Sequence, residues 1–346
     1  MSANTSSDAT NTPTLSTKPR RGCLFYIKRG LKWLGLALIV LVVLGVIYQA
    51  IATETDRRAY SPAGQLYLVN GHQMHLICMG EGSPMVILEA GAGHFSATWA
   101  HVQPMVAQST RVCAYDRAGY GWSESGPEPR DAEHIVAELH SLLELAGIDP
   151  PYVLVGHSLG GIYARVYNAH YPGEVVGMAL VDATHPDNWV RQGESIQALQ
   201  AMASVSTVLA RVGLMRLFFG GQNFDLPEPY NAALKADIAS AQYWDTQRAD
   251  AAAMEATTAQ GRATGELGDL PLAVLAAGEY PAGPGRDIKF SLQHELAALS
   301  TNSTYQEIAG ANHLSLVTNE QYATLVSQVI IRVVEAARTG QPLASK

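Results

Sequence analysis

Residues 152–160 read YVLVGHSLG, and this stretch decides the fold that the sequence predicts. The apolar letters at 152–155 are typical of a buried strand, and a helical pattern begins after residue 160. The Gly-x-Ser-x-Gly pattern between them places Ser158 at a sharp strand-to-helix turn, where the glycines leave room for a strained backbone. The start of the helix adds free N–H donors beside the serine hydroxyl. We therefore predict that Ser158 is a nucleophile at the carboxyl end of a strand.

Short apolar or alternating runs recur on both sides of this turn. Between the later ones lie helical stretches such as 132–146, whose apolar residues follow helical spacing. Strands that alternate with helices indicate a mostly parallel sheet covered on both faces. The first two runs, joined through Asn70-Gly71, indicate an antiparallel hairpin instead. The predicted strands are 66–69, 74–79, 85–89, 111–115, 152–155, 175–182, 272–276 and 304–308.

The stretch 187–268 differs from the rest because it contains no convincing strand. Long helical segments rich in Ala, Gln and Met run over 199–219 and 230–258. We predict that residues 187–268 form a helical cap inserted between the sixth and seventh strands. The core of the domain would then consist of residues 60–186 and 269–338.

Three further motifs surround the serine turn in the sequence. Residues 115–123 (YDRAGYGWS) match an Asp-Arg-x-Gly-x-Gly-x-Ser signature, 310–313 (GANH) match a Gly-x-x-His loop, and 88–93 (LEAGAG) follow the third predicted strand. In this order and spacing, the motifs resemble those of the alpha/beta-hydrolase fold superfamily over about residues 60–338. The resemblance implies an α/β fold with an eight-stranded, mostly parallel sheet flanked by helices and a helical cap.

The chemistry follows from the residue types at these positions. A serine hydroxyl is a poor nucleophile at neutral pH, so it needs a base, and His313 is placed to accept its proton and later donate it. The resemblance assigns the oxyanion hole to the backbone N–H groups of Leu159, which follows the nucleophile, and Ala92.

The acid that orients His313 is open at this stage. Most members of the superfamily place it after the seventh strand in a Gly-x-x-Asp pattern, but here that loop reads AGEYP, with proline at the aspartate position. A minority take the acid from the end of the sixth strand, where this chain has Asp182. Asp182 is therefore the first candidate, Glu279 the alternative, and Asp287 a third choice.

Charge and histidine context exclude several other classes of function. The overall net charge is −8, but residues 1–60 contain 8 Lys and Arg against 3 Asp and Glu, so the remainder is strongly acidic. An acidic body without a basic stripe argues against binding of nucleic acid. His72 and His75 have no acidic or cysteine companion in the sequence, and His294 has no second histidine at helical spacing. We expect neither a metal site nor a cofactor.

The N-terminal residues predict a membrane anchor. Residues 2–17 are mostly polar, residues 18–32 contain six Lys and Arg, and the whole stretch 1–32 is predicted to be disordered. It precedes an uncharged apolar run that reaches 20 residues over 33–52. About 20 residues suffice to cross a bilayer, and the positive-inside rule leaves 1–32 in the cytoplasm. We expect a single-pass signal-anchor with the domain after it extracytoplasmic. Cleavage near Ala52, which would yield a secreted protein, is the alternative because Ala50-Ile51-Ala52 matches a signal-peptidase pattern.

Cys78 and Cys113 lie on predicted strands that are neighbours in the sheet order of the superfamily. An extracytoplasmic location permits a disulfide between them.

Together these features predict a membrane-anchored serine hydrolase that cleaves small-molecule or lipid-like carboxylic esters through an acyl-serine intermediate. The same fold supports cleavage of amides, peptides or carbon–carbon bonds, and a non-catalytic ligand-binding protein is a further alternative. Dehalogenation is disfavoured because that branch of the superfamily has aspartate at the position of Ser158.

Overall fold

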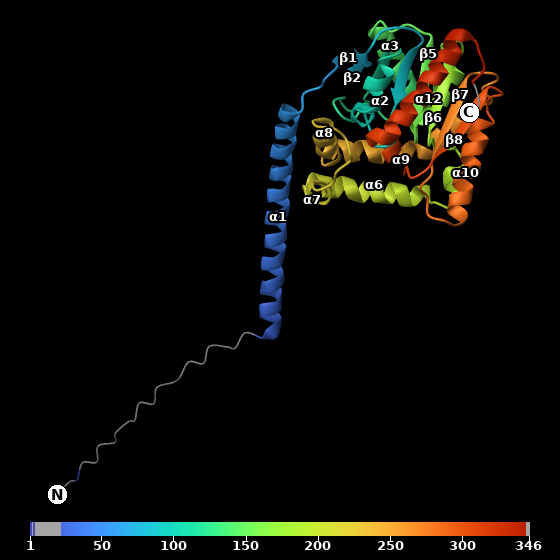
Figure 1. The fold of residues 1–346 in the computed structure, drawn as a ribbon. Helices are drawn as coiled ribbons and strands as arrows, with labels where there is room; N and C mark the ends of the chain where they lie inside the picture. Colours follow the sequence, from blue (N-terminus) through green and yellow to red (C-terminus); the bar gives the residue numbers. More distant parts are fainter. Residues whose placement is uncertain (2, 4–21, 344–346) are drawn as a thin grey trace. The chain divides into compact units, whose positions relative to one another are not determined.

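The computed structural model describes residues 1, 3 and 22–343 (Figure 1). The chain divides into two compact units, Met1–Leu44 and Gly45–Lys346. Helix α1 (Cys23–Ala59) extends from one unit into the other and contains the predicted span 33–52. Over residues 22–343, α1 is the only helix long and apolar enough to cross a bilayer, and an 18-residue window within it has a mean hydropathy of 2.6. It is a candidate anchor. Residues 2 and 4–21 of the predicted disordered tail fall outside the described residues, but residues 23–32 are helical as the start of α1, so the prediction of disorder is wrong there.

The second unit is built on an eight-stranded sheet with the order β1-β2-β4-β3-β5-β6-β7-β8. The pairs β1/β2 and β2/β4 are antiparallel and all other pairs are parallel. This confirms the predicted α/β fold. The strands are β1 (Gln65–Val69), β2 (His72–Met79), β3 (Met85–Glu89), β4 (Val112–Tyr115), β5 (Tyr152–His157), β6 (Val175–Val181), β7 (Leu272–Ala277) and β8 (Ser303–Ile308).

The predicted hairpin is confirmed between β1 and β2. Asn70 and Gly71 connect the strands, and both have positive φ angles, 48° and 94°. Two consecutive residues with positive φ form the turn whose twist matches that of paired strands, and Asn-Gly is the pair that adopts it most readily.

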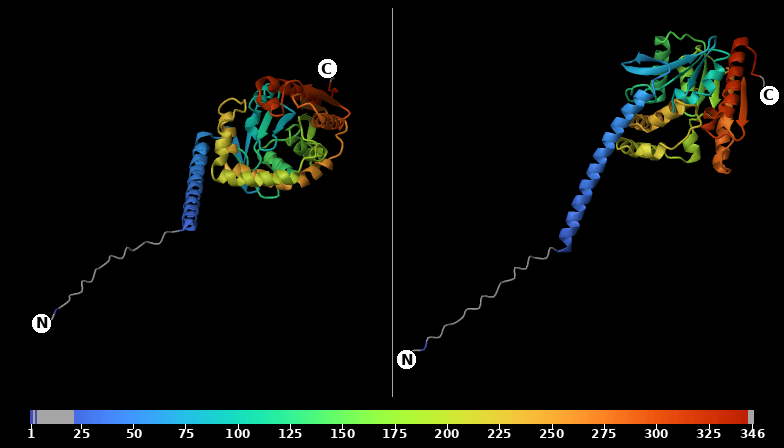
Figure 2. Two further views of the ribbon diagram at one scale, coloured as in Figure 1. Left: turned by 90° about the horizontal axis from the view of Figure 1, so that it is seen from below. Right: turned by 60° about the vertical axis from the view of Figure 1, so that its left-hand side comes forward.

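Helices cover both faces of the sheet because the central strands are buried on both sides (Figure 2). One apolar core joins α3, α4 and α10 to the sheet, with residues such as Ile135, Val166 and Leu296. The other joins α2 and α12 to the opposite face through Val106 and Ile330. The bounds of these helices are η1 (Ser96–Trp99), α2 (Val102–Val106), α3 (Ala132–Leu145), α4 (Gly160–His170), α10 (Pro284–Ala297), α11 (Ser315–Thr318) and α12 (Glu320–Thr339).

Five helices lie between β6 and β7: α5 (Asn188–Gln192), α6 (Ile196–Arg211), α7 (Leu214–Phe219), α8 (Tyr230–Ile238) and α9 (Ala241–Arg262). Each of the two long helices expected from the sequence is divided. Gly213 has a φ of 77° and separates α6 from α7. Ser240 accepts a hydrogen bond from the N–H of Tyr243 and caps the start of α9. Gly and Ser are common helix-capping residues, but the apolar pattern alone does not reveal where they interrupt a helix.

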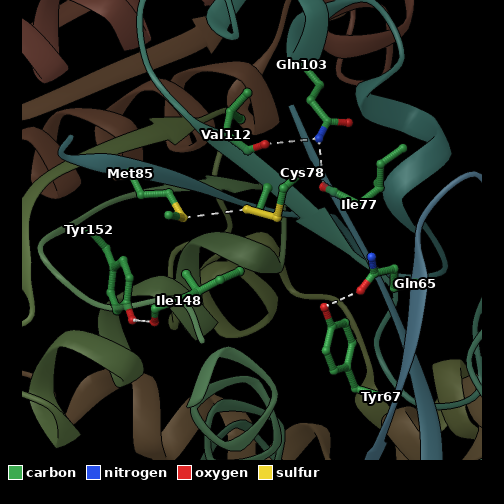
Figure 3. The surroundings of a disulfide bond; sticks show 10 residues. Gln65, Tyr67, Ile77, Cys78, Met85, Gln103, Val112, Ile148 and Tyr152 are labelled. Carbon is green, nitrogen blue, oxygen red and sulfur yellow. Dashed lines mark hydrogen bonds between the residues drawn. A yellow bond between two sulfur atoms is a disulfide. The ribbon is translucent and has the colours of Figure 1, made fainter. Parts of the chain in front are cut away.

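Cys78 and Cys113 form a disulfide between the antiparallel strands β2 and β4, where they are direct partners (Figure 3). The Gln103 side chain ties the same two strands, because its Nε2 donates to the carbonyls of Ile77 and Val112. Cys23 is a free, exposed thiol.

Thiol titration tests this pairing. We expect one reactive thiol per chain, that of Cys23, in the denatured and unreduced protein, and three after reduction. Three thiols before reduction would contradict the disulfide and weaken the argument for export.

Candidate active site

Three strand ends meet at the carboxyl edge of the sheet and bring the predicted site residues together. Ser158 follows β5, Asp182 follows β6, and His313 lies in the loop after β8. His313 Nε2 is 2.9 Å from Ser158 Oγ, and His313 Nδ1 is 2.5 Å from Asp182 Oδ2. In open α/β sheets, this edge is where ligands bind. The three side chains therefore form one continuous hydrogen-bonded line.

The backbone at Ser158 explains the glycines around it. Ser158 has a φ of 55°, a left-handed conformation that L-residues rarely adopt. A Cβ at Gly156 would lie 2.5 Å from the carbonyl oxygen of Gly160, and a Cβ at Gly160 would lie 2.5 Å from that of Glu89. The turn is thus too tight for side chains at either position, and it directs Ser158 outward from the sheet.

Asp182 is fully buried and well supplied with donors. Its Oδ2 accepts from Tyr280 Oη at 2.5 Å and lies 3.5 Å from Lys289 Nζ, while Oδ1 accepts from the N–H of Ala277 at 3.3 Å. Burial by itself favours the protonated acid, but the hydrogen bond from His313 and the charge of Lys289 outweigh it and hold the pKa of Asp182 well below its usual range. Asp182 is therefore an ionised partner for His313.

A loop after β3 faces the serine from the other side. Ala92 and Leu159 line the same cavity as Ser158, and neither backbone N–H donates a hydrogen bond within residues 22–343. Arg117 orders this loop, since its guanidinium donates to the carbonyls of Ala90 and Gly91 at 2.7 and 2.5 Å. The same guanidinium pairs with the buried carboxylate of Glu89.

Comparison with known proteins agrees with this arrangement. The model of the alpha/beta hydrolase family matches residues 86–326. The chain belongs to this family.

Curated relatives of this alpha/beta hydrolase match only parts of its length. It is 31% identical over 134 residues to an uncharacterised vacuolar membrane protein of Saccharomyces cerevisiae, covering 34% of this chain and 21% of that one. It is 28% identical over 120 residues to epoxide hydrolase 4 of Mus musculus, covering 34% and 33%. The chain thus spans well under two thirds of these relatives.

Among solved structures, an esterase from Exiguobacterium antarcticum superimposes on the hydrolase with a TM-score of 0.58. The two are 18% identical, and the match covers 77% of this chain and 99% of the esterase. At this identity the likeness shows the shared fold.

The alternative acids of the hydrolase do not reach His313. Glu279 and Asp287 are exposed, and neither makes a side-chain hydrogen bond to the imidazole in the described part of the chain. Glu279 instead uses its backbone N–H, which donates to the carbonyl of Ala311 at 2.9 Å. The geometry favours Asp182.

Sequence reasoning missed two supporting residues, Tyr280 and Lys289. Tyr280 lies in the AGEYP loop after β7, the loop that supplies the acid in most members of the superfamily, and its phenol donates to Asp182. Lys289, from α10, is almost fully buried. The sequence around Lys289 gives no sign of its carboxylate partner, because Asp182 is distant in the chain.

His157 holds the base from the opposite side of the hydrolase site. Its Nε2 lies 3.0 Å from the carbonyl oxygen of His313, so it fixes the backbone of the base. Burial, together with the neighbouring His313 and His94, keeps the pKa of His157 well below its usual value. His157 is therefore neutral, and its role is the hydrogen bond to the backbone of His313.

The cavity beside Ser158 has a volume of about 160 Å³. Most of its lining residues belong to the cap: Trp189, Leu199, Gln247, Asp250, Ala251 and Met254. Ala92, Ser158, Leu159 and Thr184 of the core complete the lining. A mostly apolar wall with a few polar groups is typical of a small-molecule site.

His72 and His75 do have acidic companions, contrary to the reading of the sequence alone. His75 Nδ1 is 3.1 Å from Asp116 Oδ2, and His72 Nε2 is 3.5 Å from Glu138 Oε1. These carboxylates are far away in the sequence, which is why spacing does not reveal them. Within residues 22–343, no group of three or more His, Cys, Asp or Glu side chains is arranged as a metal site.

Proposed function

We propose that this alpha/beta hydrolase is a serine hydrolase that cleaves carboxylic esters through an acyl-serine intermediate. The observation that carries the proposal is the line from Asp182 through His313 to Ser158, with contacts of 2.5 and 2.9 Å. A buried carboxylate that accepts from one imidazole nitrogen leaves the other free to accept the proton of the serine hydroxyl.

The reaction follows from these contacts. His313 Nε2 takes the proton as Ser158 Oγ attacks the ester carbonyl, and the oxyanion that forms accepts hydrogen bonds from the N–H groups of Ala92 and Leu159. Collapse of this intermediate breaks the ester bond, and His313 returns the proton to the leaving alcohol. Water then attacks the acyl-serine with the same base, which releases the acid and restores Ser158. Asp182 stabilises the imidazolium in both halves.

The cavity supports an ester with an apolar acyl group. Trp189 from α5, Leu199 from α6 and Met254 from α9 contribute its apolar walls. These three side chains suit an alkyl chain, while Ser158 and the two free N–H groups occupy one end. No described contact favours a peptide or a carbon–carbon bond instead.

We further propose that residues 33–52 span a membrane, with 1–32 cytoplasmic and the core (60–186 and 269–338) and cap (187–268) extracytoplasmic. The high mean hydropathy of an 18-residue window in α1 and the likeness to a vacuolar membrane protein support membrane association. Retention of the helix is favoured over cleavage near Ala52 because Gln49, in the same apolar run, is buried and donates to the carbonyl of Ala239 at 2.8 Å. Cleavage would remove this contact.

A fluorophosphonate probe, which reacts with activated serines, tests the enzyme proposal. We expect the full-length protein to be labelled and the Ser158→Ala variant to lose both labelling and about 10⁴- to 10⁶-fold of its esterase rate. The matched control is Ser204→Ala, because Ser204 is an exposed serine of the cap. Absence of labelling in the wild type, or labelling that persists in Ser158→Ala, would leave the non-catalytic alternative.

A further inference from the structure

Exposed large apolar side chains of the second unit gather on two consecutive cap helices. Beyond residue 60, six of the ten such side chains in the described chain belong to α6 and α7. Leu217 is 73% exposed and Phe218 is 64% exposed. We call the set the cap ridge, and it consists of Met202, Val205, Val208, Leu214, Leu217 and Phe218. A concentration of this kind on one segment indicates an interaction surface, whereas scattered exposed residues would not.

Helix α6 has two distinct faces. Met202, Val205 and Val208 follow one another at three-residue spacing and are exposed, while Ala203, Ser206 and Ala210 are buried against the rest of the cap. Figures 1 and 2 show α6 beside α9 at the margin of the cap. The stretch from 196 to 219 contains two arginines, Arg211 and Arg216, and no acidic residue. A helical segment with an apolar exposed face and basic but no acidic side chains is suited to a membrane interface.

The junction of α6 and α7 packs directly on the C-terminal part of α1. Gly45 is so close to Val212 that a Cβ there would lie 2.5 Å from the Val212 carbonyl oxygen, and a Cβ on Gly213 would lie 3.2 Å from the Tyr48 ring. Arg216 Nε donates to Gln49 Oε1 at 3.0 Å, and its Nη1 lies 2.6 Å from Asp56 Oδ2. All these residues belong to the second unit.

These contacts fix the depth of the cap ridge relative to a bilayer. Gly45 lies about 10 Å of helix before Ala52, the end of the predicted span. If residues 33–52 cross the membrane, whatever packs beside Gly45 and Tyr48 lies at the level of the lipid and not above it. Exposed side chains near that junction, on the side that does not pack against α1, then face lipid.

We propose that the cap ridge inserts into the outer leaflet of the membrane and that the hydrolase takes esters held in that leaflet. This rests on the proposed anchor and the proposed esterase activity. Helix α6 connects the two environments, because Leu199 lines the cavity of Ser158 while Met202 and Val205 are exposed on the same helix. We expect an acyl chain to enter the site from the lipid along α6, and the substrate class is then a lipid ester.

A depth measurement tests the insertion. The full-length protein carries Cys23→Ser, which removes the free thiol, and one new cysteine from Val205→Cys or Phe218→Cys. An environment-sensitive fluorophore is attached to this cysteine. The labelled protein is measured in phosphatidylcholine vesicles with and without spin-labelled lipid. We expect strong quenching by the spin-labelled lipid at both positions. The matched control is Leu145→Cys, because Leu145 is an exposed apolar residue of α3, 57% exposed, and we expect no quenching there.

A label placed by Val40→Cys separates the inference from the proposals on which it rests. Quenching at 40 but not at 205 and 218 would overturn the insertion and leave the anchor standing. Absence of quenching at 40 would overturn both. Labels at 205 and 218 that are shielded from aqueous iodide but not quenched by lipid would show that a second copy of the chain covers the ridge, which also overturns it.

Activity tests the substrate class. We expect Phe218→Glu to lower hydrolysis of an ester embedded in vesicles by about tenfold or more, the partition effect of one large apolar side chain. Hydrolysis of a short water-soluble ester should not change, and Leu145→Glu should change neither rate. Equal rates of Phe218→Glu and wild type on the embedded ester would overturn delivery from the leaflet. If the wild-type protein hydrolysed neither the embedded ester nor the soluble one, the proposed esterase activity itself would be contradicted.

Discussion

The Asp182→Asn variant is expected to lose about three to four orders of magnitude in kcat on a soluble ester while its fold is retained. An amide in place of the carboxylate no longer requires the tautomer of His313 that carries its proton on Nδ1. It also removes the negative charge that stabilises the imidazolium. Because the pKa of Asp182 is held well below its usual range, the wild-type carboxylate is ionised throughout the neutral range, and the loss should appear at every pH tested there.

Glu279→Gln is the matched control, because Glu279 was the alternative acid and its side chain is exposed in the loop that neighbours Asp182. We expect it to keep turnover within a few fold of wild type. Circular dichroism and thermal unfolding check that Asp182→Asn has not lost its fold, since Lys289 then faces a neutral partner at 3.5 Å. Near-normal turnover of Asp182→Asn, with a large loss in Glu279→Gln, would reverse the assignment.

Much of the fold was predictable because buried strands leave a local signal. All eight predicted strands are present, and β3 has the predicted bounds of 85 and 89. A strand buried on both faces is apolar along most of its length, so its ends lie close to the ends of the apolar run, as in β3, where only the last residue, Glu89, is polar. The cap helices were less predictable, because a left-handed residue such as Gly213 divides a helix without interrupting its apolar pattern.

The site, like the fold, was predictable from the sequence only in part. Ser158 and His313 lie in short motifs whose chemistry depends on neighbours in the sequence. The choice between Asp182 and Glu279 depends on which strand end faces the imidazole, and this is fixed by the register of β6 against β7. Gln49 shows the same limit, because a polar residue in an apolar helix gains its partner, Ala239, only from the tertiary fold.

The second large effect is expected from Arg117, whose replacement by Met should lower kcat by about two to three orders of magnitude, the loss typical of a displaced oxyanion donor. The guanidinium is 2% exposed and holds the loop of Ala92 in place through the carbonyls of Ala90 and Gly91. Methionine fills a similar volume but offers no donor, so the loop is free to shift away from the oxyanion. Measurement of kcat and KM on a soluble ester checks this.

Loss of Arg117 also affects stability, and this effect must be separated from catalysis. Burial already raises the pKa of Glu89, although Arg117 pairs with it, so Glu89 would be left buried without a cation. Removing one partner of a buried ion pair typically costs about 3–5 kcal/mol of the free energy of unfolding. A fall in rate could therefore reflect unfolded molecules unless the folded fraction is measured.

Arg130→Met supplies the matched control. Arg130 is equally buried and pairs with Glu138 at 2.7 Å, but in the described part of the chain its side chain makes no hydrogen bond or ion pair with the loop of Ala92. We expect both variants to lose stability and only Arg117→Met to lose kcat per folded molecule. Arg117→Lys should lie between Arg117→Met and wild type, because one ammonium cannot span a carboxylate and two carbonyls as a planar guanidinium does. Equal kcat per folded molecule in Arg117→Met and Arg130→Met would show that Arg117 acts on stability alone and that the oxyanion loop does not depend on it.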